Sequence, residues 1–430
     1  MYCACVRAID TRNLNERMKP ISFSIPRTTT SGRRNHIRLQ QSDAVIWIVV
    51  LVIAGYPLLG TLISFTTLPS LFASVPIRAA VILLSLLMMR KMNISRWLLQ
   101  TNVLIFTFWI VYIARLLWDL FVAQIPVASL YLFNFLFFCF IPAMALMHAP
   151  VYDERRLFRL LMPICMLICV LALIAGNTNL SGARAYTEDN EGRLFLETVN
   201  PITFGGIGVT TVLMALCWIR SCHRWIHWFF VLIAMLLGVL TIQLAASRGP
   251  LVSLSVCLVA LALFDRSFRW LMLPLLVLFP ILLIGDYSDS SNLLLSRIDM
   301  SSQSDHSEVR MVIQASAIGQ FLDNPLFGSA IIEPLSDNYP HNLFIEVAMA
   351  TGVFGLVLIT LILVKLLRKC FTRIRVRQLP LSLLMLQSVV DIQFSGNVAS
   401  SASLWILFTL MAITPIGIDK PFSLVNKVAQ

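Results

Sequence analysis

The chain has 430 residues, of which 58% are hydrophobic and only 13% are charged. Soluble domains usually carry about 25% charged residues, so the composition excludes an ordinary soluble enzyme and indicates a membrane protein. The net charge is +11, but the basic residues are grouped by loop, and this grouping excludes nucleic-acid binding as the reason for the charge.

Apolar stretches of about 20 residues recur along the chain, and each is long enough to cross a hydrocarbon core of roughly 30 Å as a helix. Continuous apolarity with scattered Gly and Pro favours helices over barrel strands, which alternate with a period of two. The predicted fold class is all-α integral membrane. The twelve predicted transmembrane helices cover 44–65, 70–89, 97–118, 128–147, 157–175, 200–219, 225–243, 249–264, 270–284, 342–364, 379–395 and 400–415.

These spans define the predicted organisation of the chain, in which one larger loop subdomain lies between helices 9 and 10. The segments are a disordered basic tail over 1–43, helices 1–5 over 44–175, an outer loop over 176–199, helices 6–9 over 200–284, a large outer loop over 285–341 with a surface helix at 308–322, helices 10–12 over 342–415, and a tail over 416–430.

The basic residues sort to one side of the predicted membrane. With a cytoplasmic first tail, the inner segments hold most of the 33 Lys and Arg residues, and every lysine. The positive-inside rule therefore predicts that both termini are cytoplasmic. The nine cysteines lie in the tail, in spans or at inner boundaries, so we expect no outer disulfide. Cys165 and Cys169 fit packing better than metal binding, because the apolar span around them offers no His or acidic ligand.

The surface helix is predicted from its ends and its apolar pattern. Ser307 is a candidate N-cap, and Asp323-Asn324-Pro325 is a stop signal. The side chains that approximate one apolar face are Val309, Val312, Ile313, Ala317, Ile318 and Phe321. This face predicts a helix that lies along the membrane surface or over the bundle.

Polar residues stand at the outer start of three predicted spans. Arg193 precedes Asn200-Pro201, Ser247-Arg248-Gly249-Pro250 opens the eighth span, and Pro340-His341-Asn342 opens the tenth. A helix N-terminus has unpaired N–H groups and a partial positive charge, so an adjacent arginine strengthens an anion site. These three starts predict phosphate binding.

An arginine near a membrane surface commonly contacts only lipid headgroups, and we assign Arg184 and Arg297 to that role. Arg248 is predicted to bind a ligand because its loop is tight and built from small residues. Arg310 is assigned similarly, whereas for Arg193 the two interpretations balance.

The remaining polar candidates each have two interpretations. His341 is either a capping or interface histidine or a general base, for which its ordinary pKa near 6.5 is suited. Arg78 and Arg115 lie near the outer ends of their spans, where an arginine either lines a polar cavity or extends to the membrane surface.

An ordered set of segments over residues 193–360 resembles the O-antigen ligase and polymerase family. The segments are Arg193 with Asn200-Pro201-Ile202 and Gly205, Ser247-Arg248-Gly249, Glu308-Val309-Arg310, Phe321 to Gly328, His341-Asn342, and Thr351-Gly352-Val353-Phe354-Gly355. One departure is the short loop between Gly328 and His341, which leaves less protein to enclose an acceptor.

The resemblance implies a bacterial inner-membrane glycosyltransferase that works on the periplasmic face without a metal ion, cofactor or nucleotide sugar. The donor would be a glycan on undecaprenyl diphosphate. The acceptor would be the lipid A core in a ligase, or another lipid-linked saccharide in a polymerase. By resemblance, Arg248 and Arg310 match the arginines at the donor diphosphate, and His341 matches the histidine at the acceptor.

The predicted function is an O-antigen ligase with metal-independent, inverting chemistry. Its catalytic residues are His341, Arg248 and Arg310. Its predicted substrate-binding residues are Arg193, Asn200, Asn342, Arg115 and Arg78. The SRG and PHN segments favour ligase slightly over an O-antigen or exopolysaccharide polymerase. A lipid-linked glycan transporter is the alternative from another class, although the inner halves of the spans hold few ionisable residues, of which Asp391 is the main candidate.

Overall fold

The computed structural model describes residues 42–66, 68–90, 100–149, 152–177, 198–219, 222, 224–269, 305–333, 336 and 338–417. The predicted span 270–284 and most of both predicted tails and of the loop 176–199 lie outside these residues. The same is true of Arg193 and of the two arginines assigned to lipid headgroups, Arg184 and Arg297. Within the described ranges the chain is helical, apart from loops and one isolated antiparallel bridge between Glu333 and Asn338.

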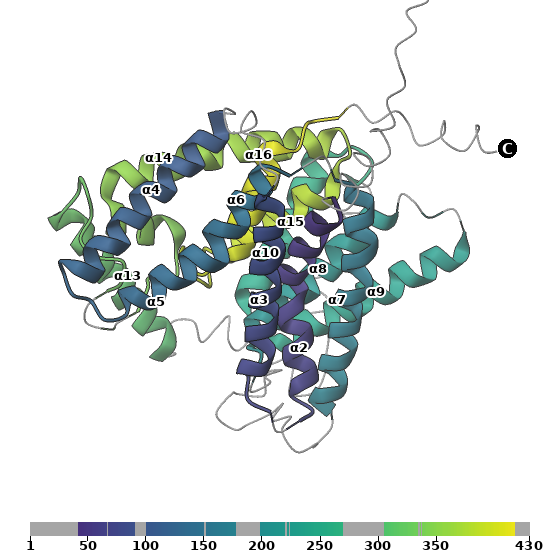
Figure 1. The fold of residues 1–430 in the computed structure, drawn as a ribbon. Coiled ribbons are helices and arrows are strands. Elements are labelled where there is room, and N and C mark those ends of the chain that lie inside the picture. The colour runs from purple at the N-terminus through teal and green to yellow at the C-terminus, as the bar shows by residue number, and fades with distance from the viewer. Residues whose placement is uncertain are drawn as a thin grey trace, which may run out of the picture. The chain divides into compact units, whose positions relative to one another are not determined.

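The helices follow one another along the chain as drawn in Figure 1. They are the π-helix η2 (Leu51–Gly55), α2 (Tyr56–Ile63), α3 (Leu71–Met89), α4 (Gln100–Phe121), α5 (Ala128–Asn134), the π-helix η4 (Phe135–Phe140), α6 (Ile141–Met147), α7 (Glu154–Asn177), α8 (Pro201–Ile219), α9 (Trp225–Ala245), α10 (Arg248–Phe264), α13 (Asp305–Asp323), α14 (Leu343–Arg375), α15 (Leu379–Asp391) and α16 (Ala402–Ile413).

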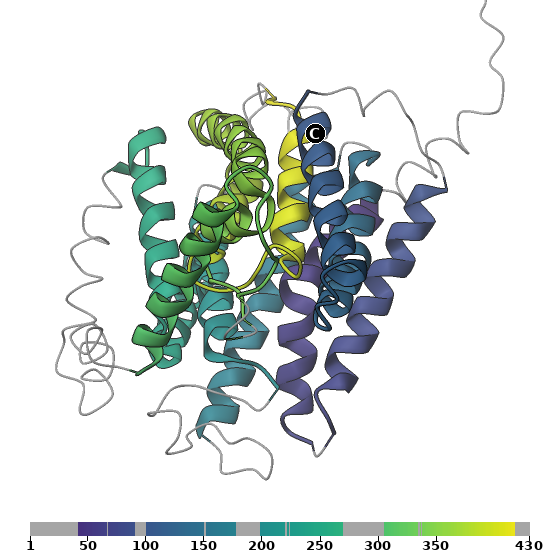
Figure 2. The same cartoon turned by 90° about the vertical axis from the view of Figure 1, so that its left-hand side faces the viewer.

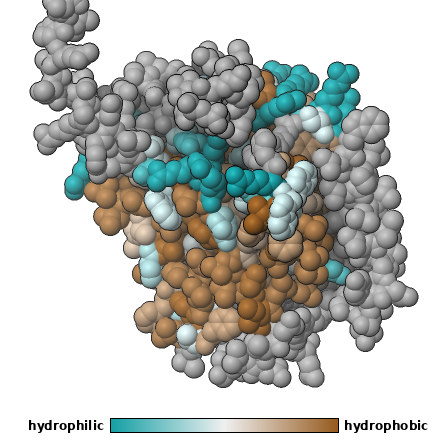
Figure 3. Space-filling model, turned by 90° about the vertical axis from the view of Figure 1, so that its right-hand side faces the viewer, coloured by the Kyte–Doolittle hydropathy of each residue, from teal (hydrophilic) through white to brown (hydrophobic). Residues whose placement is uncertain are grey.

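The described residues contain 8 helices that are long and apolar enough to cross a membrane, and the shorter apolar helices are α10, α15 and α16. The protein is therefore an all-helical, multi-pass membrane protein, as predicted. The predicted total of twelve spans stays a prediction, because 270–284 lies outside the described residues. Figure 3 shows a broad hydrophobic surface on one face of the molecule with hydrophilic side chains along its border. Exposed apolar residues of this kind suit contact with lipid.

The last two helices are shorter than predicted. α15 ends at Asp391 and α16 begins at Ala402, whereas the expected spans were 379–395 and 400–415. Their 13 and 12 residues give lengths of only about 20 and 18 Å, less than the roughly 30 Å of a hydrocarbon core. The irregular residues 392–401 between them are hereafter the 392–401 segment, in which Ile392 and Asn397 to Ala399 are buried and Phe394 and Ser400 are exposed.

The 392–401 segment satisfies its backbone groups within the protein, as non-helical backbone at membrane depth must. Val398 N–H donates to the Glu346 carboxylate at 2.9 Å, and Trp405 Nε1 donates to the Val398 carbonyl at 2.9 Å. Trp405 is fully buried and stacks on Phe108 of α4, with ring centroids 5.4 Å apart. The bonds to Glu346 and Trp405 therefore fix the segment against α14 and α16.

α14 contains a break at Gly352, where φ is +65° and ψ is −161°. A Cβ at Gly352 would overlap the carbonyl of Leu326, and one at Gly328, where φ is +74°, would overlap the backbone of Ala350. The break removes helical hydrogen bonds within α14, and the backbone groups that it frees bond to the chain that follows α13. Val353 N–H donates to the Pro325 carbonyl at 2.7 Å, and Ser329 N–H donates to the Met349 carbonyl at 2.8 Å. The Gly352 break thus holds the chain that follows α13 against α14.

α13 differs from the predicted surface helix in its start and in its buried face. It begins at Asp305, so Ser307 lies inside the helix rather than at its N-cap, whereas the end at Asp323 agrees with the stop signal. Ile313 and Ala317 are buried, but Val312 and Ile318 are exposed. The buried face also carries Ser316, which donates to the buried Glu333 at 2.8 Å. Polar contacts with the following loop therefore set the orientation of α13 beside α14 (Figure 2).

We predict that Gly352→Ala destabilises the protein, because alanine disfavours positive φ and its Cβ has no space. A residue held in such a conformation costs about 1–3 kcal/mol. The thermal unfolding midpoint in detergent should fall, as measured by size-exclusion chromatography after heating. Gly319→Ala is the matched control, since nothing lies within 4 Å of its added Cβ. Equal midpoints for the two variants would contradict the structural role of the break.

Candidate functional site

The start of α14 is built by a local cap. The Asn342 side chain accepts hydrogen bonds from Phe344 N–H at 3.1 Å and Ile345 N–H at 3.2 Å. This confirms the predicted helix start and assigns the Asn342 oxygen a capping role. His341 immediately before it has a φ of +53°, a conformation that non-glycine residues rarely adopt and that is concentrated at functional sites.

His341 lies between α13 and the start of α14. Its ring packs on Tyr339 with centroids 4.4 Å apart, and Gln314 of α13 donates to the neighbouring Pro340 carbonyl at 3.0 Å. The imidazole Nδ1 is buried and has no hydrogen-bond partner among the described residues. The Nδ1 atom of this half-buried ring is thus a buried polar atom that the surrounding protein leaves unpaired.

The exposed Arg310 lies four residues before Gln314 on α13, so both occupy one side of the helix. Burial, and then the positive charge of Arg310, lower the pKa of His341 to about 4. The same guanidinium charge opposes the effect of burial, which raises the pKa of Tyr339. At neutral pH the structure thus presents an uncharged imidazole within electrostatic range of an arginine.

Glu346 lies one helical turn after Asn342 and is 1% exposed. One carboxylate oxygen accepts the Val398 N–H, and the other is buried with no hydrogen-bond partner among the described residues. Tyr131 and Tyr339 are both within electrostatic range of Glu346. Glu346 is not among the site residues predicted from the sequence, although an isolated acidic residue inside a predicted span is a signal of function.

Arg115 bonds to groups on its own helix, α4, and on the chain that follows α13. It pairs with the buried Asp119 on the next turn of α4 and donates to the carbonyls of Gly328 and Ser329. The second Asp119 oxygen accepts the Ile331 N–H at 2.9 Å. These bonds anchor the chain after α13 to α4, so Arg115 shapes the surroundings of the site. Its predicted contact with substrate stays a prediction.

Arg78 lies elsewhere, on α3. Its guanidinium sits over the Phe138 ring, 4.4 Å from the centroid, in a cation–π contact that suits a cation in an apolar setting. The side chain is exposed. No described contact brings it to His341 or Arg310, and its binding role stays a prediction.

Arg248 is the first residue of α10, and only Ala246 and Ser247 separate it from α9. This tight connection agrees with the prediction, and the Arg248 side chain is exposed. A Cβ at the next residue, Gly249, would lie 3.1 Å from Phe394 Cβ. The α10 N-terminus therefore packs on the same 392–401 segment that Glu346 anchors.

The start of α8 also agrees with the prediction. Asn200 Oδ1 accepts hydrogen bonds from the Thr203 N–H and hydroxyl, both at 2.8 Å, and Pro201 is the first helical residue. The exposed Asn200 side chain thus caps α8. Its predicted partner in substrate binding, Arg193, lies outside the described residues.

The candidate site thus has two parts, and the 392–401 segment joins them. One part holds Arg310, Tyr339, His341 and Glu346 at the junction of α13 and α14, and the other holds Arg248 at the start of α10. Residues 233–360 match the O-antigen ligase family model. This region runs from α9 to the middle of α14 and contains both parts.

The match confirms that this region resembles the O-antigen ligase family. Members of the family are glycosyltransferase-like enzymes that act as O-antigen ligases or in a polymerase-like role. Lipid-linked glycans and membrane lipids are their general partners. A search among curated proteins finds no match to the chain.

We predict that Glu346→Ala loosens the 392–401 segment. The buried Val398 N–H would lose its acceptor, at a cost of about 1–3 kcal/mol. Hydrogen exchange of peptides that cover 392–401 should accelerate. Glu346→Gln keeps an acceptor oxygen and is the matched control, with exchange close to wild type. Unchanged exchange in the alanine variant would show that the carboxylate does not anchor the segment.

Proposed function

We propose that the protein is a periplasmic-face glycosyltransferase that moves a glycan from undecaprenyl diphosphate to a sugar hydroxyl of the lipid A core. The observation that carries this proposal is that Arg310 lies within electrostatic range of the uncharged His341, in the region that matches the O-antigen ligase family model. The reaction needs two groups, which are a cation for the leaving diphosphate and a base for the acceptor hydroxyl.

The arginines supply the site for the donor diphosphate. Arg248 and Arg310 are both exposed, and a guanidinium presents paired N–H donors that match phosphate oxygens. Arg248 also starts α10, whose first N–H groups favour an anion. Arg193 would add a third cation from the loop before α8. Negative charge grows on the diphosphate as it leaves, so these cations stabilise the transition state more than the bound donor.

His341 takes the proton of the acceptor. The acceptor oxygen forms a bond to the anomeric carbon while the bond from that carbon to the diphosphate oxygen breaks, and the electron pair leaves with undecaprenyl diphosphate. The hydroxyl proton passes to the imidazole. A direct displacement of this kind inverts the anomeric centre.

The charge of Arg310 couples donor binding to the strength of this base. Part of the lowering of the His341 pKa comes from Arg310, and a bound diphosphate offsets that positive charge. The pKa of His341 should then rise towards its ordinary value near 6.5. The imidazole becomes a stronger base when the leaving group is in place.

The transfer assay tests the proposal with purified protein, an undecaprenyl diphosphate-linked glycan and lipid A core. Wild type should extend the lipid A core. We expect His341→Ala to lower the rate by about 100-fold or more, and Arg248→Lys or Arg310→Lys to lower it by about 100-fold. Arg266→Lys, in the exposed turn after α10, is the control that should keep wild-type activity.

Other outcomes of this assay point to the other functions. Transfer to a second lipid-linked repeat unit, and not to the lipid A core, would identify a polymerase. Movement of lipid-linked glycan across vesicles without transfer would identify a transporter. Wild-type rates in the His341→Ala or Arg248→Lys variants would contradict the assigned roles.

The dependence of rate on pH tests the coupling. The base must be unprotonated, so activity falls when the pH drops below its pKa. For kcat/KM, which reports the free enzyme, the fall should occur near the His341 pKa of about 4. For kcat, which reports the bound complex, it should occur at a higher pH. If kcat/KM and kcat fell at the same pH, that result would contradict coupling through Arg310.

A further inference from the structure

A cavity of about 230 Å³ lies between η2, α8, α15 and α16, next to the 392–401 segment. None of Arg248, Arg310 and His341 lines it. Residues of these four helices and of the 392–401 segment line the cavity. They include Val52, Ile53, Ile202, Thr203, Leu384, Gln387, Ser388, Asp391, Ser395, Ser401, Ser403 and Leu407. The cavity is therefore separate from the groups that the proposed reaction uses.

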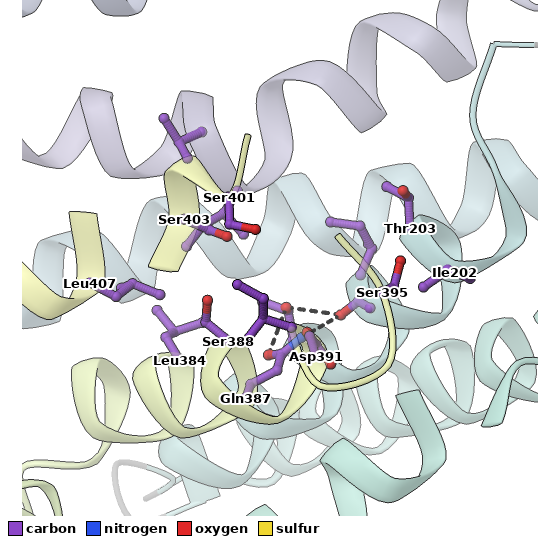
Figure 4. Close-up of a pocket in the computed structure, with 16 residues that line it drawn as sticks. Ile202, Thr203, Leu384, Gln387, Ser388, Asp391, Ser395, Ser401, Ser403 and Leu407 are labelled. Atoms are coloured by element: carbon purple, nitrogen blue, oxygen red, sulfur yellow. Dashed lines mark hydrogen bonds between the residues drawn. The ribbon is translucent and has the colours of Figure 1, made fainter. Parts of the chain in front are cut away.

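Hydroxyl groups from three helices line the cavity. Figure 4 shows Ser388 of α15, Ser401 and Ser403 at the start of α16, and Thr203 of α8 around one space. The Gln387 amide is already bonded, because it donates to the Gly206 carbonyl at 2.9 Å and accepts from the Thr210 hydroxyl at 3.1 Å. The Thr203 hydroxyl donates to Asn200 and can still accept, whereas a serine hydroxyl can both donate and accept, so this lining suits a ligand with many hydroxyls.

Asp391 defines the polarity of the ligand. It is the last residue of α15. Its Oδ1 atom is buried with no hydrogen-bond partner among the described residues, while Ser253 and Gln387 contact the carboxyl group. A carboxyl oxygen of this kind can form a hydrogen bond with a ligand hydroxyl.

Apolar side chains share the lining with these hydroxyls. They are Val52 and Ile53 of η2, Leu384 of α15 and Leu407 of α16. A sugar ring combines a rim of hydroxyls with apolar C–H faces, and both kinds of surface find a partner here. The volume corresponds to roughly seven or eight water molecules at about 30 Å³ each, which is enough space for one sugar ring.

The backbone around the cavity departs from regular α-helix on two sides. η2 is a π-helical stretch within the span Ser42–Ile63, and such stretches are frequent at functional sites. The 392–401 segment interrupts the bundle between two short helices. Irregular backbone at membrane depth occurs where it is buried or lines a cavity, as in the ligand sites of transport proteins.

The cavity also lies close to the α10 N-terminus. Ser395 lines it, and the preceding residue, Phe394, packs on Gly249 beside Arg248. We propose that the cavity is a subsite for one sugar ring of the glycan substrate, which Asp391 and the surrounding hydroxyls bind beside the diphosphate site. The inference rests on the proposed glycosyltransferase function for the identity of the glycan. The sugar belongs either to the lipid-linked donor or to the acceptor.

Binding measurements on the full chain in nanodiscs test the subsite. The probes are undecaprenyl diphosphate alone, undecaprenyl diphosphate with one sugar from the set glucose, galactose and N-acetylglucosamine, and lipid A core. Asp391→Asn and Ser403→Leu should weaken binding of a sugar-bearing probe by about 10-fold, with binding of bare undecaprenyl diphosphate unchanged. Ser255→Leu on α10, whose hydroxyl bonds to its own helix at Leu251, is the matched control.

The two sources of the sugar give different patterns. A loss for the sugar-bearing diphosphate alone assigns the subsite to the donor, and a loss for lipid A core alone assigns it to the acceptor. Unchanged binding of every sugar-bearing probe, or an equal loss for bare undecaprenyl diphosphate, overturns the subsite.

A third measurement separates this proposal from the function on which it rests. Failure of wild type to bind any undecaprenyl diphosphate probe contradicts the proposed function. Saturation-transfer NMR with the methyl glycosides of the same sugars then decides the subsite by itself. A signal that Asp391→Asn and Ser403→Leu abolish and Ser255→Leu keeps supports the subsite, and no signal with wild type overturns it.

Discussion

The buried bond between the Glu346 carboxylate and the Val398 N–H is the interaction on which the candidate site depends. Backbone groups inside a membrane protein need partners from the protein itself, and the 392–401 segment is too irregular to supply all of them. Glu346 supplies one of them to Val398 from the first turn of α14. The same segment packs on Gly249 beside Arg248 and lines the cavity. One anchored segment thus relates the His341 region, the Arg248 region and the cavity.

A second constraint places Arg310 beside His341. The break at Gly352 brings the backbone of 325–329 against α14, and Arg115 and Asp119 hold the following residues on α4. α13 is thereby fixed near the start of α14. The resulting proximity of a cation and an imidazole lowers the His341 pKa, so the chemistry of the histidine follows from how a neighbouring helix is attached.

The helix starts and the site arginines differ in how well their roles could be predicted. Asn200 and Asn342 are caps because each bonds to N–H groups within three residues, and such local geometry can be read from adjacent residues. Arg115 and Arg248 both stand near the end of a predicted span, and Asp119, one turn after Arg115, is a local sign of an ion pair. Arg115 also donates to loop carbonyls more than 200 positions away. No local pattern indicates that second contact.

The sequence by itself determined that the chain is a helical membrane protein, where most of its helices lie, and which residues open α8, α10 and α14. Hydrophobicity over about 20 residues and capping within one turn are properties of neighbouring residues. The tertiary structure alone decided the early end of α15, the burial of Glu346 and the lining of the cavity by Asp391. These features join positions far apart in the chain, and long-range packing contacts leave no periodic signal in a single sequence.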